Sequence, residues 1–177
     1  MLDIKTKNID PLILSWLTYK DSLTDRLNSN LKKPARLQCL SQHWTAPSWW
    51  DSHVLAIQKE SVLHRDIIMW AEGEACWYAR TILPISTYHA ARSIFDRLEN
   101  ESLGRLIFNE PMIKRLDMLY YAVNKGSLEY FWLKKSLLGV DVLEDEYWLR
   151  LSSFVVRDSF PFFLVEILLP GLLRSID

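Results

Sequence analysis

The sequence has few glycines, few cysteines and no long apolar run, and each shortage excludes a class of protein. With five glycines in 177 residues, it lacks the G-x-x-x-x-G-K-[ST] and G-x-G-x-x-G loops that bind nucleotide phosphates, and the G-x-S-x-G elbow of acyl transfer. Two cysteines, Cys39 and Cys76, fit reduced thiols better than a disulfide framework. The longest apolar stretch, 160–173, is interrupted by Glu166 and is shorter than the ~20 residues that cross a bilayer. We therefore expect a cytoplasmic protein without membrane insertion.

Charge and metal-ligand patterns exclude further classes. Twenty-one Lys and Arg against 22 Asp and Glu give a net charge of −1 with no basic block, which argues against nucleic-acid binding. The eight tryptophans would need a positively charged groove to stack bases, so we assign them to core packing. The four histidines form no H-x-x-H or H-E-x-x-H pair, so no metal site is predicted. Charged residues crowd the first ten positions, and no secretion signal is expected.

Helix caps and turn residues divide the N-terminal part of the chain. Asp10 followed by Pro11 predicts a helix start, and Ser22 begins a capping box for a second short helix. Residues 37–42 are expected to form a strand. The stretch 43–60 shows no clean period, and we expect a long connection that packs its aromatic side chains inward.

The rest of the chain is rich in strand patterns. Two runs, 62–71 and 75–83, predict a hairpin because the Gly73 between them tolerates a positive φ. A helix is expected over 86–98, a short helix near 102, strands over 116–123, 147–156 and 160–169, and either a strand or a helix over 127–138. Because the helices do not alternate with the strands, the pattern favours an α+β fold with an antiparallel sheet. No linker or repeat is found, so we expect one domain over 1–177.

Three charged residues lie within apolar strand patterns. Glu166 interrupts an apolar strand, and burial of an unpaired carboxylate is costly, so it must be exposed, paired or protonated. Arg65 and Arg80 interrupt the central hairpin, where surface positions or cross-strand pairs are the plain alternatives. A sheet face with one acid and one or two guanidiniums suits a small anionic organic ligand, since guanidinium binds carboxylate through two parallel hydrogen bonds.

Four segments together are similar to one known family. They are Trp16-Leu-x-x-x-Asp21-Ser22-Leu23-Thr24-x-Arg26, then Arg65-x-Ile67-x-x-x-Ala71-x-Gly73-Glu74 continuing to Ala79-Arg80-Thr81-x-x-Pro84-x-Ser86-Thr87, then Leu103-Gly104-Arg105-x-x-Phe108, and Glu166-x-x-Leu169-Pro170. In this order and spacing they resemble the chorismate pyruvate-lyases of bacterial ubiquinone synthesis, which release 4-hydroxybenzoate and pyruvate from chorismate. The chain departs from the family at Cys76, where a tryptophan is common, and in the acidic stretch 144–150.

The resemblance implies a particular fold and site. The implied fold is α+β, with an antiparallel sheet and two helical hairpin lids over an internal ligand site. Arg65 matches the arginine that binds the substrate carboxylate, and Glu166 matches the acid at the hydroxyl side of the ring. Both are the expected catalytic residues. Leu23 on the first lid and Leu103 on the second match ligand-contacting positions, and Arg80 matches a further arginine of the motif that we expect to join the substrate-binding residues.

The resemblance also implies a physiological role. The protein would be a cofactor-free, metal-free cytoplasmic monomer that catalyses the first committed step of ubiquinone biosynthesis and is inhibited by its product. Its partners would be chorismate and 4-hydroxybenzoate. The alternative is a non-catalytic aryl-acid carrier, or an effector-sensing protein of the same fold. Such sensors carry a DNA-binding domain ahead of the ligand domain, whereas the lyase-like motifs begin at Trp16, so we expect the enzyme.

Overall fold

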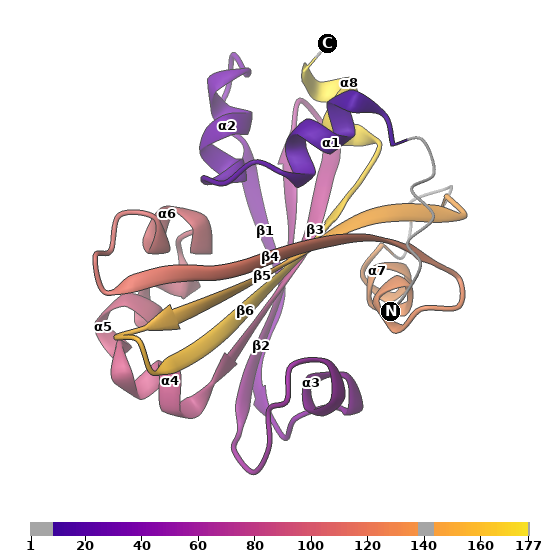
Figure 1. Cartoon of the computed structure of the whole chain (residues 1–177). Helices are drawn as coiled ribbons and strands as arrows, with labels where there is room; N and C mark the ends of the chain where they lie inside the picture. The colour runs from indigo at the N-terminus through magenta and orange to yellow at the C-terminus, as the bar shows by residue number, and fades with distance from the viewer. Residues whose placement is uncertain (1–8, 138–143, 177) are drawn as a thin grey trace.

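The computed structural model describes residues 9–137 and 144–176, and its framework is a six-stranded antiparallel sheet (Figure 1). The strands are β1 Arg36–Thr45, β2 Val62–Ala71, β3 Glu74–Pro84, β4 Ile113–Asn124, β5 Glu146–Val156 and β6 Phe160–Leu168. Their order is β1-β2-β3-β6-β5-β4, so the last strand of the sequence lies between β3 and β5. The α+β fold with an antiparallel sheet, predicted from the sequence, is confirmed.

Short helices cover both faces of this sheet (Figure 1). They are α1 Pro11–Leu17, α2 Leu23–Ser29, α3 Trp49–Val54, α4 Ile85–Ala90, α5 Arg92–Phe95, the 3₁₀ helix η1 Asp96–Glu99, α6 Leu103–Ile107, α7 Leu128–Ser136 and α8 Gly171–Ile176. None of the helices in the described ranges is long and apolar enough to cross a membrane.

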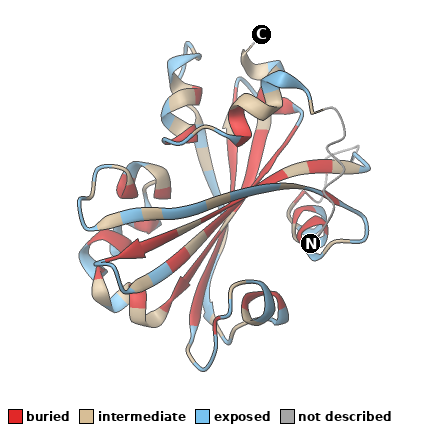
Figure 2. Cartoon of the chain, in the orientation of Figure 1, coloured by how far each residue is buried: buried red, intermediate tan, exposed pale blue. Residues whose placement is uncertain are grey.

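Two hydrophobic cores lie on opposite faces of the sheet, and buried residues are concentrated in the central strands β2, β3, β5 and β6 (Figure 2). The lid-side core packs α1, α2, α5 and α6 on the sheet and includes Leu23, Leu27, Trp77, Leu103, Phe154 and Phe162. The far-side core packs α3 and α7 on the other face and includes Trp50, Ile68, Tyr78, Leu133 and Val165. Because side chains alternate along a strand, neighbours such as Ile67 and Ile68 enter different cores.

The β2–β3 hairpin fixes the register of the sheet's centre. Glu72 (φ 49°) and Gly73 (φ 83°) form its two-residue turn, and two consecutive positive φ angles match the twist of a tight hairpin. Arg65 then lies opposite Thr81, and Asp66 lies opposite Arg80. This register places Arg65 and Arg80 on different faces of the sheet.

Several expected boundaries are corrected by the structure. The connection 43–60 contains the end of β1 and all of α3, whose capping box joins Ser48 and Asp51. Its aromatics do not all point inward, since Trp50 is buried but Trp49 is 63% exposed. The helix expected over 86–98 is divided: α4 and α5 are separated at Ala91, which leaves the helical region at φ −144°, and α5 continues directly into the 3₁₀ helix η1.

The uncertain segment 127–138 is helical, as α7, up to Ser136. Its last residue, Leu138, lies outside the described residues. Strand β4 begins at Ile113, three residues before the expected start at Leu116.

Candidate active site

A narrow, partly open pocket lies between the lid-side face of the sheet and the helices above it. Three of the residues expected at the site, Arg65, Leu103 and Glu166, line it together. The other lining residues are Thr24, Leu37, Ile67, Met69, Trp77, Ala79, Thr81, Ser102, Gly104 and Leu164. The pocket is therefore apolar along its floor, with one cationic and one acidic group.

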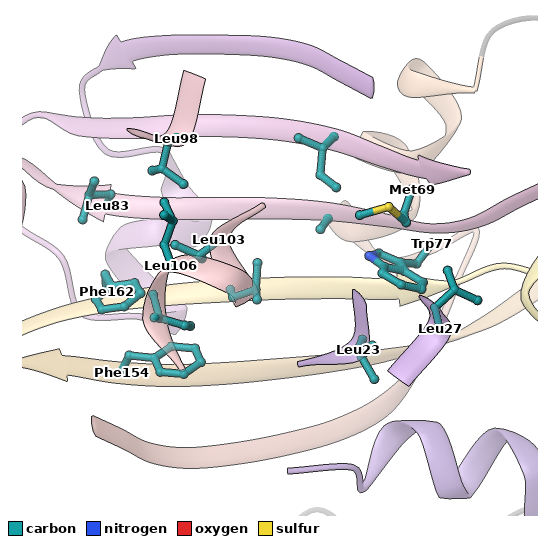
Figure 3. Close-up of a cluster of buried hydrophobic side chains, with 14 of the residues drawn as sticks. Leu23, Leu27, Met69, Trp77, Leu83, Leu98, Leu103, Leu106, Phe154 and Phe162 are labelled. Atoms are coloured by element: carbon teal, nitrogen blue, oxygen red, sulfur yellow. The ribbon is translucent and has the colours of Figure 1, made fainter. Parts of the chain in front are cut away.

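Two short helices close the pocket from above, and each begins behind a serine cap. Ser22 Oγ accepts a hydrogen bond from the Asp25 amide at 3.2 Å at the start of α2, and Ser102 caps α6 in the same way. Leu23 and Leu103 are the first residues of these helices, and both lie over the sheet, Leu23 near Trp77 and Leu103 beside Leu106 (Figure 3). We call residues 11–29, which contain α1 and α2, the first lid, and residues 96–107, which contain η1 and α6, the second lid.

The two lids meet at Gly104. A Cβ atom placed there would lie 3.1 Å from Ser22 Oγ, closer than ordinary van der Waals contact. Glycine therefore allows the second lid to approach the cap of the first. Leu23 itself is buried in the lid-side core, and its neighbour Thr24 lines the pocket.

Arg65 enters the pocket from the middle of β2 and is only 2% exposed. Its Nη2 donates to the Glu101 carbonyl oxygen at 3.1 Å, while its buried Nε has no hydrogen-bond partner among the described residues. Burial lowers the pKa of Arg65, partly offset by the adjacent Cys39. A buried guanidinium with unused donors is a strong site for an anion.

Glu166 lies on β6, which pairs with β3 on the side away from β2, and it is 5% exposed. Arg150 on β5 lies directly opposite it, and Arg150 Nε donates to Glu166 Oε2. Of the three states the sequence leaves open for this carboxylate, the structure therefore has the paired one. The partner Arg150 was missed at the sequence level, although the three residues between the strands expected over 147–156 and 160–169 are typical of a hairpin that places it opposite Glu166.

The structure does not bring Arg80 into this pocket. Arg80 alternates with the pocket residues Ala79 and Thr81 and so points to the opposite face. There its Nε and Nη2 bind Asp66 Oδ1 and Oδ2, both at 2.7 Å, and its guanidinium lies 4.2 Å from the centre of the Trp132 ring. The cross-strand pair considered at the sequence level is thus what forms.

Sequence reasoning missed the polar residues of the lids and the floor. Thr24, Ser102 and Thr81 all line the pocket. Thr24 and Ser102 are the sequence neighbours of Leu23 and Leu103, and Thr81 lies opposite Arg65 in the hairpin. This proximity to predicted site residues is the signal by which the sequence could have identified them.

Comparison with solved structures defines the fold class. The chain is similar to PhnF from Mycobacterium smegmatis, with a TM-score of 0.62 and 15% identity over 90% of this chain and 67% of that one. It is also similar to a GntR-family transcriptional regulator from Enterococcus faecalis V583, with a TM-score of 0.53 and 10% identity over 77% of this chain and 91% of that one. The fold is therefore the chorismate lyase-like α+β fold, which this chain shares with bacterial regulators.

Comparison of sequences identifies the family. The family model for chorismate lyase matches residues 3–151, and the chain belongs to that family. A probable chorismate pyruvate-lyase of Thiobacillus denitrificans is 28% identical over 159 residues, covering 89% of this chain and 82% of the relative. One from Coxiella burnetii is 29% identical over 160 residues, covering 89% and 83%. The matched range contains Leu23, Arg65 and Leu103, while Glu166 lies beyond it.

Proposed function

We propose that the protein is a chorismate pyruvate-lyase that converts chorismate to 4-hydroxybenzoate and pyruvate. The observation that carries the proposal is the pocket that both Arg65 and Glu166 line. Apolar side chains of the sheet form most of the pocket floor between them. Family membership and the names of the relatives support the same reaction. We infer that Arg65 and Glu166 are the catalytic residues.

The sheet geometry supports a flat ring held at both ends. Arg65 is on β2 and Glu166 is on β6, and β3 lies between these strands. Two strand spacings, combined with a register offset of two residues, place their backbones ~12 Å apart. The small Ala79, opposite both Ile67 and Glu166, leaves the floor between them low. A six-membered ring with a carboxylate at one end and a hydroxyl at the other fits this span.

The reaction needs positioning and exclusion of water. In chorismate, the bond from ring carbon 3 to the enolpyruvyl oxygen breaks, a proton leaves carbon 4, and the enolpyruvyl group takes up a proton to become pyruvate. We infer that Arg65 binds the ring carboxylate, which offsets its desolvation, while Leu23 and Leu103 hold the lids over the ring. No net oxidation or reduction accompanies these steps.

The pairing of Glu166 with Arg150 favours one of two roles for the acid. A carboxylate held by a buried guanidinium is suited to accept a hydrogen bond, so Glu166 would orient the hydroxyl at carbon 4. A proton donor to the leaving oxygen, the other role, would have to be protonated beside Arg150. We therefore propose the orienting role.

The position of the pocket beneath two lids also has a physiological consequence. Lids that protect the ring during reaction slow the release of an aromatic product of similar shape, so we propose inhibition by 4-hydroxybenzoate. The product is a precursor for ubiquinone, and we propose that the enzyme acts in the cytoplasm, as a monomer, at the first committed step of that pathway.

The fold that this chain shares with bacterial regulators favours a second candidate, an effector-binding protein without chemistry. Such a protein would also use Arg65 to bind an aryl carboxylate. Turnover of chorismate separates the two functions, because only the lyase consumes it.

The test compares wild type, Arg65→Gln and Arg174→Gln. Arg174 is a matched control because it is an exposed arginine paired with a surface glutamate, Glu74. We expect kcat/KM for chorismate to fall by more than about 100-fold in Arg65→Gln, from loss of a buried charge-assisted contact, and to stay unchanged in Arg174→Gln. Near-normal turnover in Arg65→Gln would contradict the assigned role.

A further inference from the structure

Two arginines from the sheet, the buried Arg150 and the partly buried Arg115, hold the loop that joins α1 to α2. Arg150 Nη1 on β5 donates to the Tyr19 carbonyl oxygen at 2.8 Å, and Arg115 Nη1 on β4 donates to the Lys20 carbonyl oxygen. Both bonds go to backbone atoms just before Ser22, the cap of α2. The loop at the base of the first lid is therefore anchored to the sheet by side chains of two strands.

The guanidinium of Arg150 makes a second contact at the other end of its fork, to Glu166. Its Nε donates to Glu166 while its Nη1 donates to the lid loop, and the Arg150 side chain is 1% exposed. A guanidinium is planar and rigid, so its donors keep fixed relative directions. A shift of the lid loop therefore changes the geometry of the contact to Glu166, and a shift of Glu166 changes the anchor of the loop.

Arg115 adds a second positive charge beside this pair. Its guanidinium lies 5.0 Å from the centres of the Phe108 and Phe154 rings, and its Nε and Nη2 are buried without a partner among the described residues. Burial and then the charge of Arg150 lower the pKa of Arg115, and the charges of Glu166 and Asp21 oppose this shift. Two guanidiniums thus lie near the one buried acidic side chain of the site.

We propose that Arg150 is a positioning residue that binds the Glu166 side chain and ties it to the Tyr19 carbonyl, so that closure of the first lid and orientation of the site acid occur together. This inference rests on the proposed function, because Glu166 is the acid of the active site only if the protein is the lyase. The coupling itself is a property of the folded protein without substrate, and it is measured separately from turnover.

The coupling is tested by amide hydrogen exchange of peptides covering residues 17–24. Arg150→Met removes both contacts, and exchange in this segment should rise at least about tenfold while the strands keep their protection. Arg115→Met removes only the bond to Lys20 and should give a smaller rise. Arg174→Met, which changes an exposed arginine bonded to Glu74, is the control and should leave the segment unchanged.

The decisive variant is Glu166→Gln, because Glu166 has no hydrogen bond to the lid loop among the described residues and reaches it through Arg150. Loss of its charge weakens the Arg150 contact, so exchange of residues 17–24 should rise about threefold or more. In the double variant with Arg150→Met, Glu166→Gln should add nothing further, because the connection is already absent. A purely structural role for Arg150 gives additive effects instead.

Two results overturn the proposal: lid exchange that is unchanged in Glu166→Gln, or effects of the two substitutions that add. If Arg150→Met fails to fold, the single variant Glu166→Gln still decides through the first of these results. Chorismate turnover measured on the same samples separates the two claims. Coupled exchange in a protein that does not consume chorismate would sink the proposed function and leave the positioning role standing.

Discussion

Glu166 illustrates how a single residue can look misplaced in a sequence and be well accommodated in the fold. An isolated buried carboxylate costs several kcal/mol, but Arg150 lies opposite it on the adjacent strand. From sequence, Glu166 and Arg65 could be singled out because a charge within an apolar strand is conspicuous. Arg150 was not singled out because its strand mixes polar and apolar residues on both faces, although the short connection 157–159 indicates a hairpin that pairs its strand with that of Glu166.

At Glu166, the orienting role predicts a difference between two substitutions. Glu166→Gln keeps the shape and one hydrogen-bond acceptor, so kcat should stay within about tenfold of wild type. Glu166→Ala removes the acceptor and leaves Arg150 unpaired, so kcat should fall at least about 100-fold. Steady-state assays with chorismate measure both. Equal, severe losses in the two variants would indicate that Glu166 must transfer a proton.

A second buried pair lies on the far side of the sheet. His64 Nε2 is 2.9 Å from Asp51 Oδ2. The Asp51 carboxylate also accepts a hydrogen bond from the Ser48 backbone amide, in the capping box of α3. Burial alone would raise the pKa of Asp51, but the hydrogen bonds from His64 and Ser48 outweigh it and hold the pKa below its ordinary 3.8.

This pair predicts a pH-dependent stability. Because the pKa of Asp51 is lower in the folded state, its charge stabilises the fold above its unfolded pKa, and that contribution is lost as pH falls through the folded pKa. Asp51→Asn should therefore lower the free energy of unfolding by about 1–3 kcal/mol at pH 7. This difference between wild type and variant should become smaller below about pH 4. Urea denaturation at several pH values checks this. A gap that is constant with pH would contradict it.

At the level of elements, the lids depend on close contact between two short helices. Neither α2, with seven residues, nor α6, with five, is long enough to be stable alone, so each depends on its serine cap and on packing. The contact of Gly104 with Ser22 joins them. The close approach of the two lids over the pocket therefore depends on the absence of a side chain at Gly104.

Gly104→Ala tests this junction. A methyl group 3.1 Å from Ser22 Oγ must push the lids apart or displace the cap, so affinity for 4-hydroxybenzoate should fall about fivefold to 50-fold. Quenching of tryptophan fluorescence by the product gives the dissociation constant. Gly126→Ala, in an exposed turn, serves as the control and should bind product normally. Unchanged product affinity in Gly104→Ala would show that the lids tolerate separation.

Elements with local signals were predictable from the sequence, and elements set by tertiary contacts were less so. The β2–β3 hairpin was found because a Gly-containing turn joins two apolar runs. Helix α3 was missed although Ser48 and Asp51 have capping-box spacing, since Pro47 and two tryptophans obscured any period. The α4–α5 break at Ala91 has no breaker residue, and packing on the sheet imposes it.

At the scale of the whole molecule, one sheet serves two cores, and the pocket lies in the lid-side core alone. This explains why two arginines in one hairpin have different environments: Arg65 faces the lids, and Arg80 faces α7. Alternation along the strands could be read from sequence, but the face that carries the lids could not be, because both faces of the central strands are apolar.

Enclosure by both lids predicts that release of the aromatic product limits turnover. Rapid mixing of enzyme with excess chorismate should then give a burst of product approaching one equivalent per site, followed by a slower steady rate. Added 4-hydroxybenzoate should inhibit competitively. A linear time course from the first turnover would place the slow step in the chemistry instead.

The most direct test of the central claim is conversion of chorismate by the purified wild-type protein, with pyruvate and 4-hydroxybenzoate quantified in the same samples. We expect the two products to form in equal amounts, with chorismate lost in step, and Arg65→Gln to abolish nearly all of both. Chorismate that remains intact while 4-hydroxybenzoate still binds the pocket would contradict it, and would establish a binding protein on this fold.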